Sequence, residues 1–314
     1  ACEGKSNIVF VDKVTAIAPT LVADKSQLSL KCNGSSYGKI TVTATGGKQD
    51  EPYSFLLKMQ DGSAATTSST NPNPQGVFEG LKAGVYKVEV SQLNGGCDTK
   101  SVENITITEE TAYKVKYELE DVKCNGDKNG KITIEMLPGG EQHRDGRQRK
   151  LTYAISPRLD RFLDKPAGVI DSLAPGKYFV IVQDENGCRP NEIFEKDNTT
   201  ATGLDIIEFT IGEPEPLSVT VNPEATEHES CIDAKDGKTR LRVFGGTPVS
   251  TDPITHDKVY QLIIDSNAPI AYHTKDSGDL LEGLSAGEHT FRIIDKNGCE
   301  AETAVTIEPG SEVK

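Results

Sequence analysis

Cysteine is the residue type whose number and spacing suggest chemistry in this 314-residue chain. Cysteine thiolates bind zinc when they occur in close pairs such as Cys-x-x-Cys, but the sequence contains no such pair. Widely separated cysteines are typical of disulfides, which persist outside the reducing cytosol. We therefore expect a disulfide-bonded extracellular protein without a metal or other cofactor. The cysteines are Cys2, Cys32, Cys97, Cys124, Cys188, Cys231 and Cys299.

Two sequence patterns, each present three times, contain six of these cysteines. In the first, a cysteine is followed six residues later by Gly-Lys, an alternating apolar run and a Gly-Gly pair; it begins at Cys32, Cys124 and Cys231. The second runs from Leu-x-Ala/Pro-Gly through an alternating strand to an Asn-Gly turn and ends at Cys97, Cys188 and Cys299. The distance from first to second cysteine is nearly the same each time, about 65 residues, which predicts three homologous repeats.

The repeats follow one another almost without linkers. We place them at 19–110, 111–214 and 215–310, with 1–18 as the end of an earlier repeat and 311–314 as a tail. Glu-Pro at the joints stiffens the connection, which favours a rod-like array. Cys2 is then the unpaired second cysteine of the earlier repeat. A lipid-modified cysteine is the alternative for Cys2, and the preceding Ala1 disfavours it.

Alternation of apolar and polar residues predicts strands within each repeat. In the run GKITIEM, Ile132, Ile134 and Met136 point to one face and the intervening residues point to the other. Asn-Gly and Gly-rich turns between such runs are typical of antiparallel hairpins. The fold class is therefore all-β: a tandem array of immunoglobulin-like antiparallel β-sandwich domains.

The Leu-x-Ala/Pro-Gly-x-Tyr part of the second pattern predicts a tyrosine corner. Tyr86 and Tyr178 each begin a strand just after a turn, where the hydroxyl can return to the backbone a few residues upstream. The third repeat has His289 at this position, so we expect its corner to be weaker.

A disulfide within each repeat is the expected pairing: Cys32–Cys97, Cys124–Cys188 and Cys231–Cys299. Closing a loop of ~65 residues would contribute roughly 4 kcal/mol in the chain-entropy account. However, the two cysteines of a seven-stranded sandwich would lie at opposite ends. The pairing thus requires the first strand to fold back or a middle strand to be missing, and the loose segment 63–76 favours the second option.

Together, the two patterns resemble the SprB repeat, which builds long cell-surface adhesins of gliding Bacteroidetes. The second repeat matches best, from Cys124-Asn-Gly and Gly130 to Tyr178 and the Asp-Glu-Asn-Gly-Cys turn at 184–188. The third repeat departs at Asp233 and His289, and the first inserts Gly96. The resemblance implies that the protein is exported by the type IX secretion system and displayed on the cell surface, attached to the outer membrane. It also implies that the gliding machinery moves the protein, by contacting regions that are not in this sequence.

One segment, 141–150, is rich in cations within an otherwise acidic chain. A solvated loop is one interpretation, and binding of an anionic polysaccharide or a neighbouring acidic repeat is the other. The candidate ligand-binding residues are His143, Arg144, Arg147, Arg149 and Lys150.

Other functional classes find little support in the sequence. The net charge of −14 argues against nucleic acid, no apolar run is long enough for membrane insertion, and no catalytic motif predicts an enzyme. Asp-rich turns such as 184–187 and 295–298 resemble calcium loops, but hairpin turn chemistry also explains them.

We expect the chain to be part of a stalk that contacts external surfaces and adjacent repeats. The alternatives are a polysaccharide-binding module and an accessory domain of a secreted enzyme.

Overall fold

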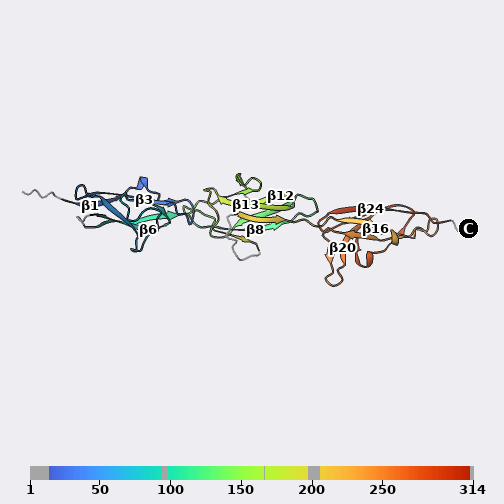
Figure 1. Cartoon of the computed structure of the whole chain (residues 1–314). Coiled ribbons are helices and arrows are strands. Elements are labelled where there is room, and N and C mark those ends of the chain that lie inside the picture. Colours follow the sequence, from blue (N-terminus) through green and yellow to red (C-terminus); the bar gives the residue numbers. More distant parts are fainter. Residues whose placement is uncertain (1–13, 94–97, 166, 197–205, 312–314) are drawn as a thin grey trace, which may run out of the picture. The chain divides into compact units, whose positions relative to one another are not determined.

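The computed structural model describes residues 14–93, 98–165, 167–196 and 206–311, which form strands and three short 3-10 turns (Figure 1). The predicted all-β class is thereby confirmed. The turns are η1 (Ala23–Lys25), η2 (Pro223–Ala225) and η3 (Lys275–Ser277). The chain divides into two compact units. The first comprises Ala1–Lys116, Met136–Tyr153 and Val182–Asp205, and the second comprises Tyr117–Glu135, Ala154–Ile181 and Ile206–Lys314. The three-repeat division is a different partition and stays a prediction.

In the first unit, residues 15–109 form two sheets around one core. One sheet has the order β1-β3-β5, with strands β1 (Thr15–Leu21), β3 (Gly38–Gly47) and β5 (Val77–Leu81). The other has the order β2-β7-β6-β4, with β2 (Ser29–Leu30), β7 (Lys100–Glu109), β6 (Gly84–Gln92) and β4 (Tyr53–Met59). Side chains from both sheets meet in the core, among them the fully buried Ile40, Leu57, Phe78 and Val88. As expected, segment 63–76 makes isolated bridges but no strand.

Residues 114–211 form a second pair of sheets, whose strands β8, β9, β10 and β13 each contain residues of both units. The order of one sheet is β12-β9-β8-β14, with β12 (Val169–Leu173), β9 (Gly130–Met136), β8 (Lys114–Glu120) and β14 (Glu192–Glu195). The order of the other is β11-β10-β13-β15, with β11 (Leu163–Asp164), β10 (Leu151–Ile155), β13 (Gly176–Asp184) and β15 (Ile206–Ile211). The predicted alternation in β9 is confirmed, because Ile132 and Ile134 are buried and Glu135 is exposed.

In the second unit, residues 218–307 form three sheets around another core that contains Tyr260, Leu262 and Phe291. The two small sheets pair β16 (Ser218–Val221) with β18 (Leu241–Phe244), and β17 (Gly237–Thr239) with β22 (Leu281–Leu284). The large sheet has the order β19-β20-β23-β24, and β21 also pairs with β20. Its strands are β19 (Ser250–Thr251), β20 (Lys258–Ile264), β21 (Ile270–His273), β23 (Gly287–Ile294) and β24 (Glu300–Ile307).

The glycine six residues after the first cysteine of each pattern has no space for a side chain. A Cβ on Gly38 would lie 2.6 Å from the Leu81 carbonyl oxygen, and one on Gly130 would lie 2.5 Å from Ile211 Cγ2. Both distances are shorter than real Cβ contacts. The recurring glycine therefore allows the strand that follows each first cysteine to pack closely against its neighbours.

The predicted tyrosine corners are present. The Tyr86 hydroxyl donates to the Lys82 carbonyl at 2.9 Å, and the Tyr178 hydroxyl donates to the Ala174 carbonyl at 3.0 Å. His289 replaces the tyrosine without losing the contact, because its Nε2 lies 2.9 Å from the Ser285 carbonyl oxygen. Its other ring nitrogen lies 2.5 Å from Asp265 Oδ2. The third corner thus keeps the hydrogen bond that a tyrosine would make and adds an ion pair.

Candidate functional site at the disulfide-linked joints

Two disulfides connect cysteines of successive sequence repeats. Cys32 is bonded to Cys188 with a Cα–Cα distance of 5.3 Å, and Cys124 is bonded to Cys299 with a Cα–Cα distance of 5.6 Å. The expected pairing within each repeat is therefore wrong for these four cysteines. The third expected pair is also absent, because Cys231 is a free, half-buried thiol. Cys97 and Cys2 lie outside the described residues.

Strand direction explains why the first cysteine of a repeat bonds forward along the chain. Strand β2 pairs in parallel with β7, with Leu30 opposite Glu109. Cys32, two residues after Leu30, therefore lies beside the end of β7, where the chain passes into the next sequence repeat. A disulfide requires a Cα–Cα distance below about 7 Å. Cys124 and Cys188, which we expected to pair, belong to different compact units.

The Cys188 turn, residues 184–188, is held together by its own aspartate. Asp184 Oδ1 accepts hydrogen bonds from the backbone N–H of Asn186 and of Cys188, both at 2.9 Å. Gly187 occupies the left-handed region at φ 82°, which glycine adopts without strain. This geometry presents the cysteine at a fixed place directly after the turn.

The Cys299 turn, residues 295–299, repeats this arrangement in the second unit. Asp295 Oδ1 accepts from Asn297 N at 2.8 Å and from Cys299 N at 2.9 Å. Its Oδ2 accepts from Thr247 N at 2.7 Å. The Asp-x-Asn-Gly-Cys sequence is thus a self-contained turn motif, which supports the interpretation of these aspartates as hairpin turn residues.

The Cys32 loop, residues 31–34, is tied both to the end of β7 and to the segment that follows the Cys188 turn. Glu109 accepts from Asn33 Nδ2 at 3.1 Å and from Gly34 N at 2.7 Å. Asn33 Oδ1 in turn accepts from Asn191 Nδ2 at 2.9 Å. The Tyr113 hydroxyl donates to the Cys188 carbonyl at 2.7 Å. We call this disulfide and its surrounding hydrogen bonds the first joint.

The second joint, around Cys124 and Cys299, uses equivalent partners. Gly126 N donates to Glu213 Oε2 at 3.0 Å, as Gly34 does to Glu109. Asn125 Nδ2 donates to the Pro214 carbonyl at 3.0 Å. From the other side, Asn297 Nδ2 donates to the Lys123 carbonyl at 2.9 Å. The two joints therefore share one arrangement, in which a Cys-Asn-Gly loop is held by a glutamate at or just after the end of the last strand of the same sequence repeat.

His143 from the cation-rich loop is buried in the first joint. Its side chain is 0% exposed, with Nδ1 3.3 Å from Glu110 Oε2 and Nε2 2.9 Å from Glu185 Oε1. Burial tends to raise the pKa of the Glu185 carboxyl, but hydrogen bonds from Lys150 N and His143 outweigh burial and lower it. His143 thus bridges a glutamate that follows β7 and a glutamate of the Cys188 turn.

Arg149 is the second buried basic side chain of the same loop. Its side chain is 1% exposed, and its Nε lies 3.4 Å from Asp184 Oδ2, which is equally buried. The guanidinium donates to the carbonyls of Gly140 and Thr111, both at 2.8 Å, and stacks 4.5 Å from the centre of the Tyr113 ring. Burial and the negative charge of Asp184 raise the pKa of the Tyr113 hydroxyl. Arg149 therefore fixes the Cys188 turn to the start of β8.

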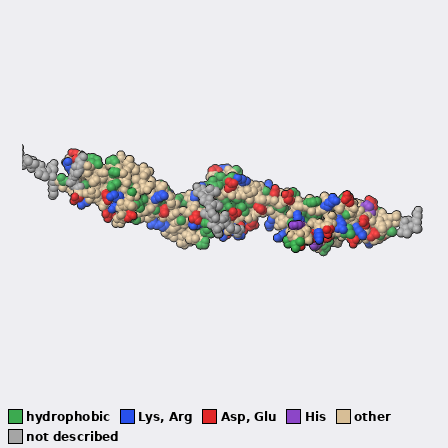
Figure 2. All heavy atoms as spheres, turned by 60° about the horizontal axis from the view of Figure 1, so that its bottom comes forward, with side chains coloured by type: hydrophobic (Ala, Val, Ile, Leu, Met, Phe, Trp, Pro, Cys, Tyr) green, Lys and Arg blue, Asp and Glu red, His purple; other side chains and the backbone are tan. Residues whose placement is uncertain are grey.

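The remaining cations of the loop, Arg144, Arg147 and Lys150, are exposed. Arg147 Nε pairs with Asp145 Oδ2 at 2.6 Å. The ligand-binding role predicted for the loop stays a prediction, and these three exposed side chains are the ones that could reach a ligand. Elsewhere, acidic and basic side chains are interspersed over the face shown in Figure 2.

His143, Asp184 and Glu185 form a cluster that could in principle hold a metal ion, with one ligand atom of each within 4.8 Å of the others. The chemistry of the cluster argues against this. Asp184 Oδ1 already accepts two backbone hydrogen bonds, and the guanidinium of Arg149 supplies the positive charge that a metal would bring. We interpret the cluster as an ion-pair network of the joint.

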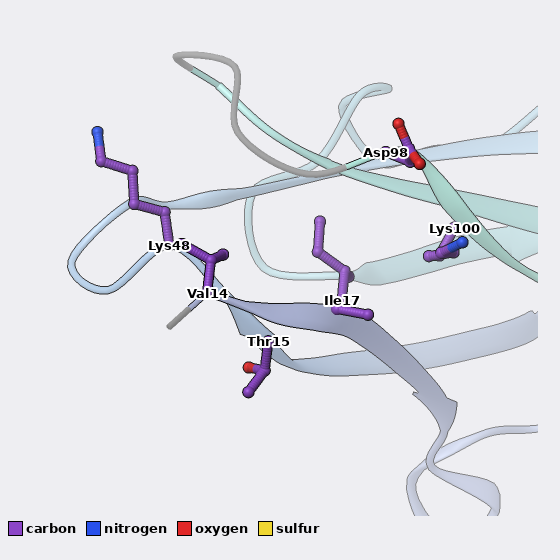
Figure 3. Close-up of a pocket in the computed structure, with 7 residues that line it drawn as sticks. Val14, Thr15, Ile17, Lys48, Asp98 and Lys100 are labelled. Atoms are coloured by element: carbon purple, nitrogen blue, oxygen red, sulfur yellow. The ribbon is translucent and has the colours of Figure 1, made fainter. Parts of the chain in front are cut away.

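The first unit has a hollow of about 410 Å³ beside the start of β1. In Figure 3, Val14 lies just before β1, and Thr15 and Ile17 lie on it. Lys48 lies on the loop after β3, Asp98 lies before β7, and Lys100 begins β7. Its lining is part apolar and part charged. Nothing in it resembles a catalytic array, and the structure does not indicate a ligand.

The sequence interpretation identified the bridging cysteines but missed the polar residues that build the joints. The glutamates stand in the repeated closing motif, at Glu109 and Glu213, and the aspartates recur in the turn motif, at Asp184 and Asp295. Their recurrence at equal places was the available signal. Asn191 and Tyr113 carry no such signal.

Comparison with known protein families gives one match. Residues 27–62, which contain the Cys32 loop and strands β3 and β4, match the family model of the SprB repeat. The resemblance stated from the sequence is thereby confirmed for this segment. No curated protein matches the chain.

The chain is also similar to solved structures at low identity. One is of a 1.5-MDa bacterial ice-binding adhesin, with 12% identity, a TM-score of 0.33 and coverage of 96% of this chain and 100% of that chain. Another is a Ca²⁺-stabilized ice-binding adhesin of an Antarctic bacterium, with 13% identity, a TM-score of 0.34 and coverage of 96% and 75%. Immunoglobulin domains 1–5 of Sidekick-1 match at 12% identity and a TM-score of 0.32; 96% of this chain is covered, and it spans 60% of that structure. Similarities at this level say nothing about what the chain binds.

Among the described residues, no helix is long and apolar enough to cross a membrane.

Proposed function

We propose that this chain is part of the stalk of an extracellular adhesin, in which tandem β-sandwich repeats act as a covalently reinforced spacer. The observation that carries the proposal is the pair of disulfides that connect successive sequence repeats, Cys32–Cys188 and Cys124–Cys299. A disulfide inside one sequence repeat would stabilise that repeat alone. A disulfide between neighbours restricts their relative motion, which is what a spacer requires.

The match of residues 27–62 to the SprB repeat supports an adhesin-type extracellular repeat protein. Disulfides also fit an oxidising, extracellular location. Attachment to the outer membrane, export by the type IX system and a role in gliding motility are the finer parts of this proposal. In this function the chain is structural and not enzymatic, and its partners are external surfaces, adjacent repeats and, through other regions, the gliding machinery.

Small-angle scattering tests the spacer function. Three sandwiches in line, each about 35 to 40 Å long, would give a radius of gyration above about 30 Å. A compact globule of the same length would have a radius of gyration of about 20 Å. We expect the larger value for the oxidised protein. A radius of gyration equal to that of the globule would exclude a rod-like spacer.

A matched variant tests the contribution of the disulfides to this shape. Replacing Cys188 and Cys299 with serine removes both bridges and changes no residue of the two core clusters around Leu57 and Leu262. We expect a broader distribution of intramolecular distances in the variant, with the same far-ultraviolet circular dichroism as the parent. Identical scattering from both proteins would show that the bridges do not restrict the joints.

A second candidate function is binding of an anionic polysaccharide, because Arg144, Arg147 and Lys150 are exposed on one loop. The triple alanine variant of these residues keeps the buried His143 and Arg149. If the loop binds, alginate should bind the parent protein and lose affinity for the variant, and the loss should shrink with added salt. Equal binding by both proteins would exclude the loop as the site.

A further inference from the structure

The Cys231 loop, residues 230–233, is built like the two loops whose cysteines are bonded. In all three loops, the residue before the cysteine donates its backbone N–H to a side chain. The accepting side chain belongs to the residue five positions after the cysteine. Lys31 N donates to the Tyr37 hydroxyl, Lys123 N to Asn129 Oδ1 and Ser230 N to Asp236 Oδ1. The free cysteine therefore stands in a loop with the same internal support as Cys32 and Cys124.

The turn shape of the loop is also preserved, although its sequence departs from Cys-Asn-Gly. Gly34 and Gly126 have φ values of 75° and 83°, and Asp233 takes the same place with a φ of 59°. Aspartate is one of the few residues other than glycine that adopt this region readily. The loop thus keeps the conformation that places a cysteine for bonding in the other two repeats.

The position of Cys231 relative to the chain is equivalent as well. Cys231 forms a parallel bridge with Ser311, four residues after the end of β24 at Ile307. Cys32 likewise follows a strand, β2, that runs parallel to β7. In each case the cysteine lies beside the segment in which the chain leaves its sandwich.

A second, independent observation is an unpaired polar atom two residues before the cysteine. Glu229 is 5% exposed; its Oε1 accepts from Lys235 N, but its Oε2 is buried without a hydrogen-bond partner. A buried carboxyl oxygen without a donor is unfavourable, because it has lost its hydrogen bonds to water without replacing them. Next to the thiol, Ile232 is 48% exposed. The other two repeats have Leu30 and Val122 at the place of Glu229.

We propose that the Cys231 loop is the docking site for the Asp-x-Asn-Gly-Cys turn of a further repeat of the same kind, joined on the C-terminal side of β24, and that Cys231 forms a disulfide with the cysteine of that turn. This rests on the proposed function, in which such repeats occur in tandem. The bond forms by thiol–disulfide exchange with a low-molecular-weight disulfide. The two thiols lose two electrons and two protons, one S–S bond forms between them, and the disulfide reagent is reduced to two thiols.

An extended chain tests the proposal. A second copy of residues 215–314, in which Cys231 is changed to serine so that it adds no free thiol of its own, is placed directly after Gly310. Three residues then separate Ile307 from the added repeat, just as three residues separate Ile211 from Glu215. The protein is equilibrated with oxidised and reduced glutathione, alkylated and digested without reduction. We expect a peptide that links Cys231 to the added copy of Cys299, and loss of alkylation at Cys231. The unextended chain should remain alkylated there.

A control and the alternative outcomes keep the test decisive. Changing Cys299→Ser in the added copy alone should restore alkylation of Cys231. If the Cys32–Cys188 and Cys124–Cys299 links are found but Cys231 stays alkylated, the inference is wrong and the proposed function stands. If the first two links are absent, the proposed function loses its main support. A link between Cys231 residues of two molecules, seen as a dimer on a non-reducing gel, would also overturn the inference.

Discussion

Cys188 is bonded to Cys32, 156 residues earlier in the chain, and not to Cys124, which is much closer in the sequence. Cys124 is bonded in turn to Cys299, 175 residues later. The two covalent loops therefore overlap, and residues 124–188 belong to both. The overlap makes each sequence repeat depend on its neighbour for a disulfide partner.

Removing one bridge should destabilise the first unit. In the chain-entropy account, a loop of 156 residues contributes about 5 kcal/mol, and measured values commonly fall to about 2 to 4 kcal/mol. We expect Cys188→Ser to lower the free energy of unfolding of this unit by several kcal/mol in a denaturant titration. Cys97→Ser is the matched control and should keep both bridges, because Cys32 bonds to Cys188 and Cys124 bonds to Cys299. Destabilisation by the control and not by Cys188→Ser would contradict the pairing.

Arg149→Met should also destabilise the first joint. The change leaves the buried Asp184 carboxylate without its cation and the carbonyls of Gly140 and Thr111 without a donor. Breaking a buried ion pair from one side typically destabilises by about 3 to 5 kcal/mol. The control Arg147→Met changes an exposed side chain of the same loop and should leave the melting temperature unchanged. Equal melting of both variants would show that Arg149 does not support the joint.

The sequence allowed the strands, the corners and the bonding role of most cysteines to be predicted, because these depend on local patterns. Ile132 and Ile134 alternate with polar residues, and Tyr86 and Tyr178 follow a fixed motif. The identity of each disulfide partner depends on which strands run in parallel. The spacing of Cys32 and Cys97 gave no information on this, since six cysteines allow 15 pairings.

The cation-rich loop was harder to predict for a related reason. Its charges suggested a solvated or ligand-binding segment, and Arg144, Arg147 and Lys150 are exposed. His143 and Arg149 are buried because the fold brings Glu110, Asp184 and Glu185 to them from distant parts of the sequence. In the sequence these partners lie between 33 and 42 residues away from the two buried side chains.

His289 should make the stability of the second unit depend on pH. Burial disfavours its charged form, but hydrogen bonds with Asp265 and the Ser285 carbonyl outweigh burial and raise its pKa above the ordinary 6.5. The folded state then binds more protons than the unfolded state, so the contribution is complete below pH 6.5 and is lost as the pH rises through the folded pKa. The free energy of unfolding of the second unit should therefore decrease as the pH rises above 6.5.

The variant His289→Tyr separates this effect from other titrations. Tyrosine at this place should donate to the Ser285 carbonyl, as Tyr86 and Tyr178 do in the other corners, and it does not titrate near neutral pH. The fall in stability above pH 6.5 should therefore be smaller in the variant. His273, which pairs with the Asp257 carboxylate, also has a raised pKa and should account for part of what remains. An unchanged pH profile would show that His289 does not contribute.

Calcium should have little effect on thermal unfolding. Asp184 and Asp295 each use one carboxylate oxygen to accept two backbone hydrogen bonds of their own turn. The other oxygen of Asp184 faces Arg149, and the other oxygen of Asp295 accepts from Thr247 N. Melting curves with calcium and with a chelator should coincide. A rise of more than about 5 °C with calcium, equivalent to roughly 1 kcal/mol in a domain of this size, would identify the turns as calcium sites.

Single-molecule stretching should reveal the overlapping loops directly. In the oxidised chain, the shortest covalent path from Cys32 to Cys299 crosses to Cys188, returns along the backbone to Cys124 and crosses again. Only the backbone between Cys124 and Cys188 then separates the two ends. At about 3.5 Å per residue, the distance between Cys32 and Cys299 cannot exceed about 220 Å, whereas the reduced chain can reach about 930 Å.

A single substitution distinguishes this topology from bridges inside each repeat. Cys97→Ser should leave the stretched length of the oxidised chain unchanged. Cys188→Ser opens the first loop, so the shortest path follows the longer stretch of backbone from Cys32 to Cys124 before it crosses to Cys299. The length should then increase by about 100 Å, at about 3.5 Å for each added residue. A larger stretched distance between Cys32 and Cys299 after Cys97→Ser would mean that Cys97 is bonded to Cys32. The proposed bridges between successive repeats would then be wrong.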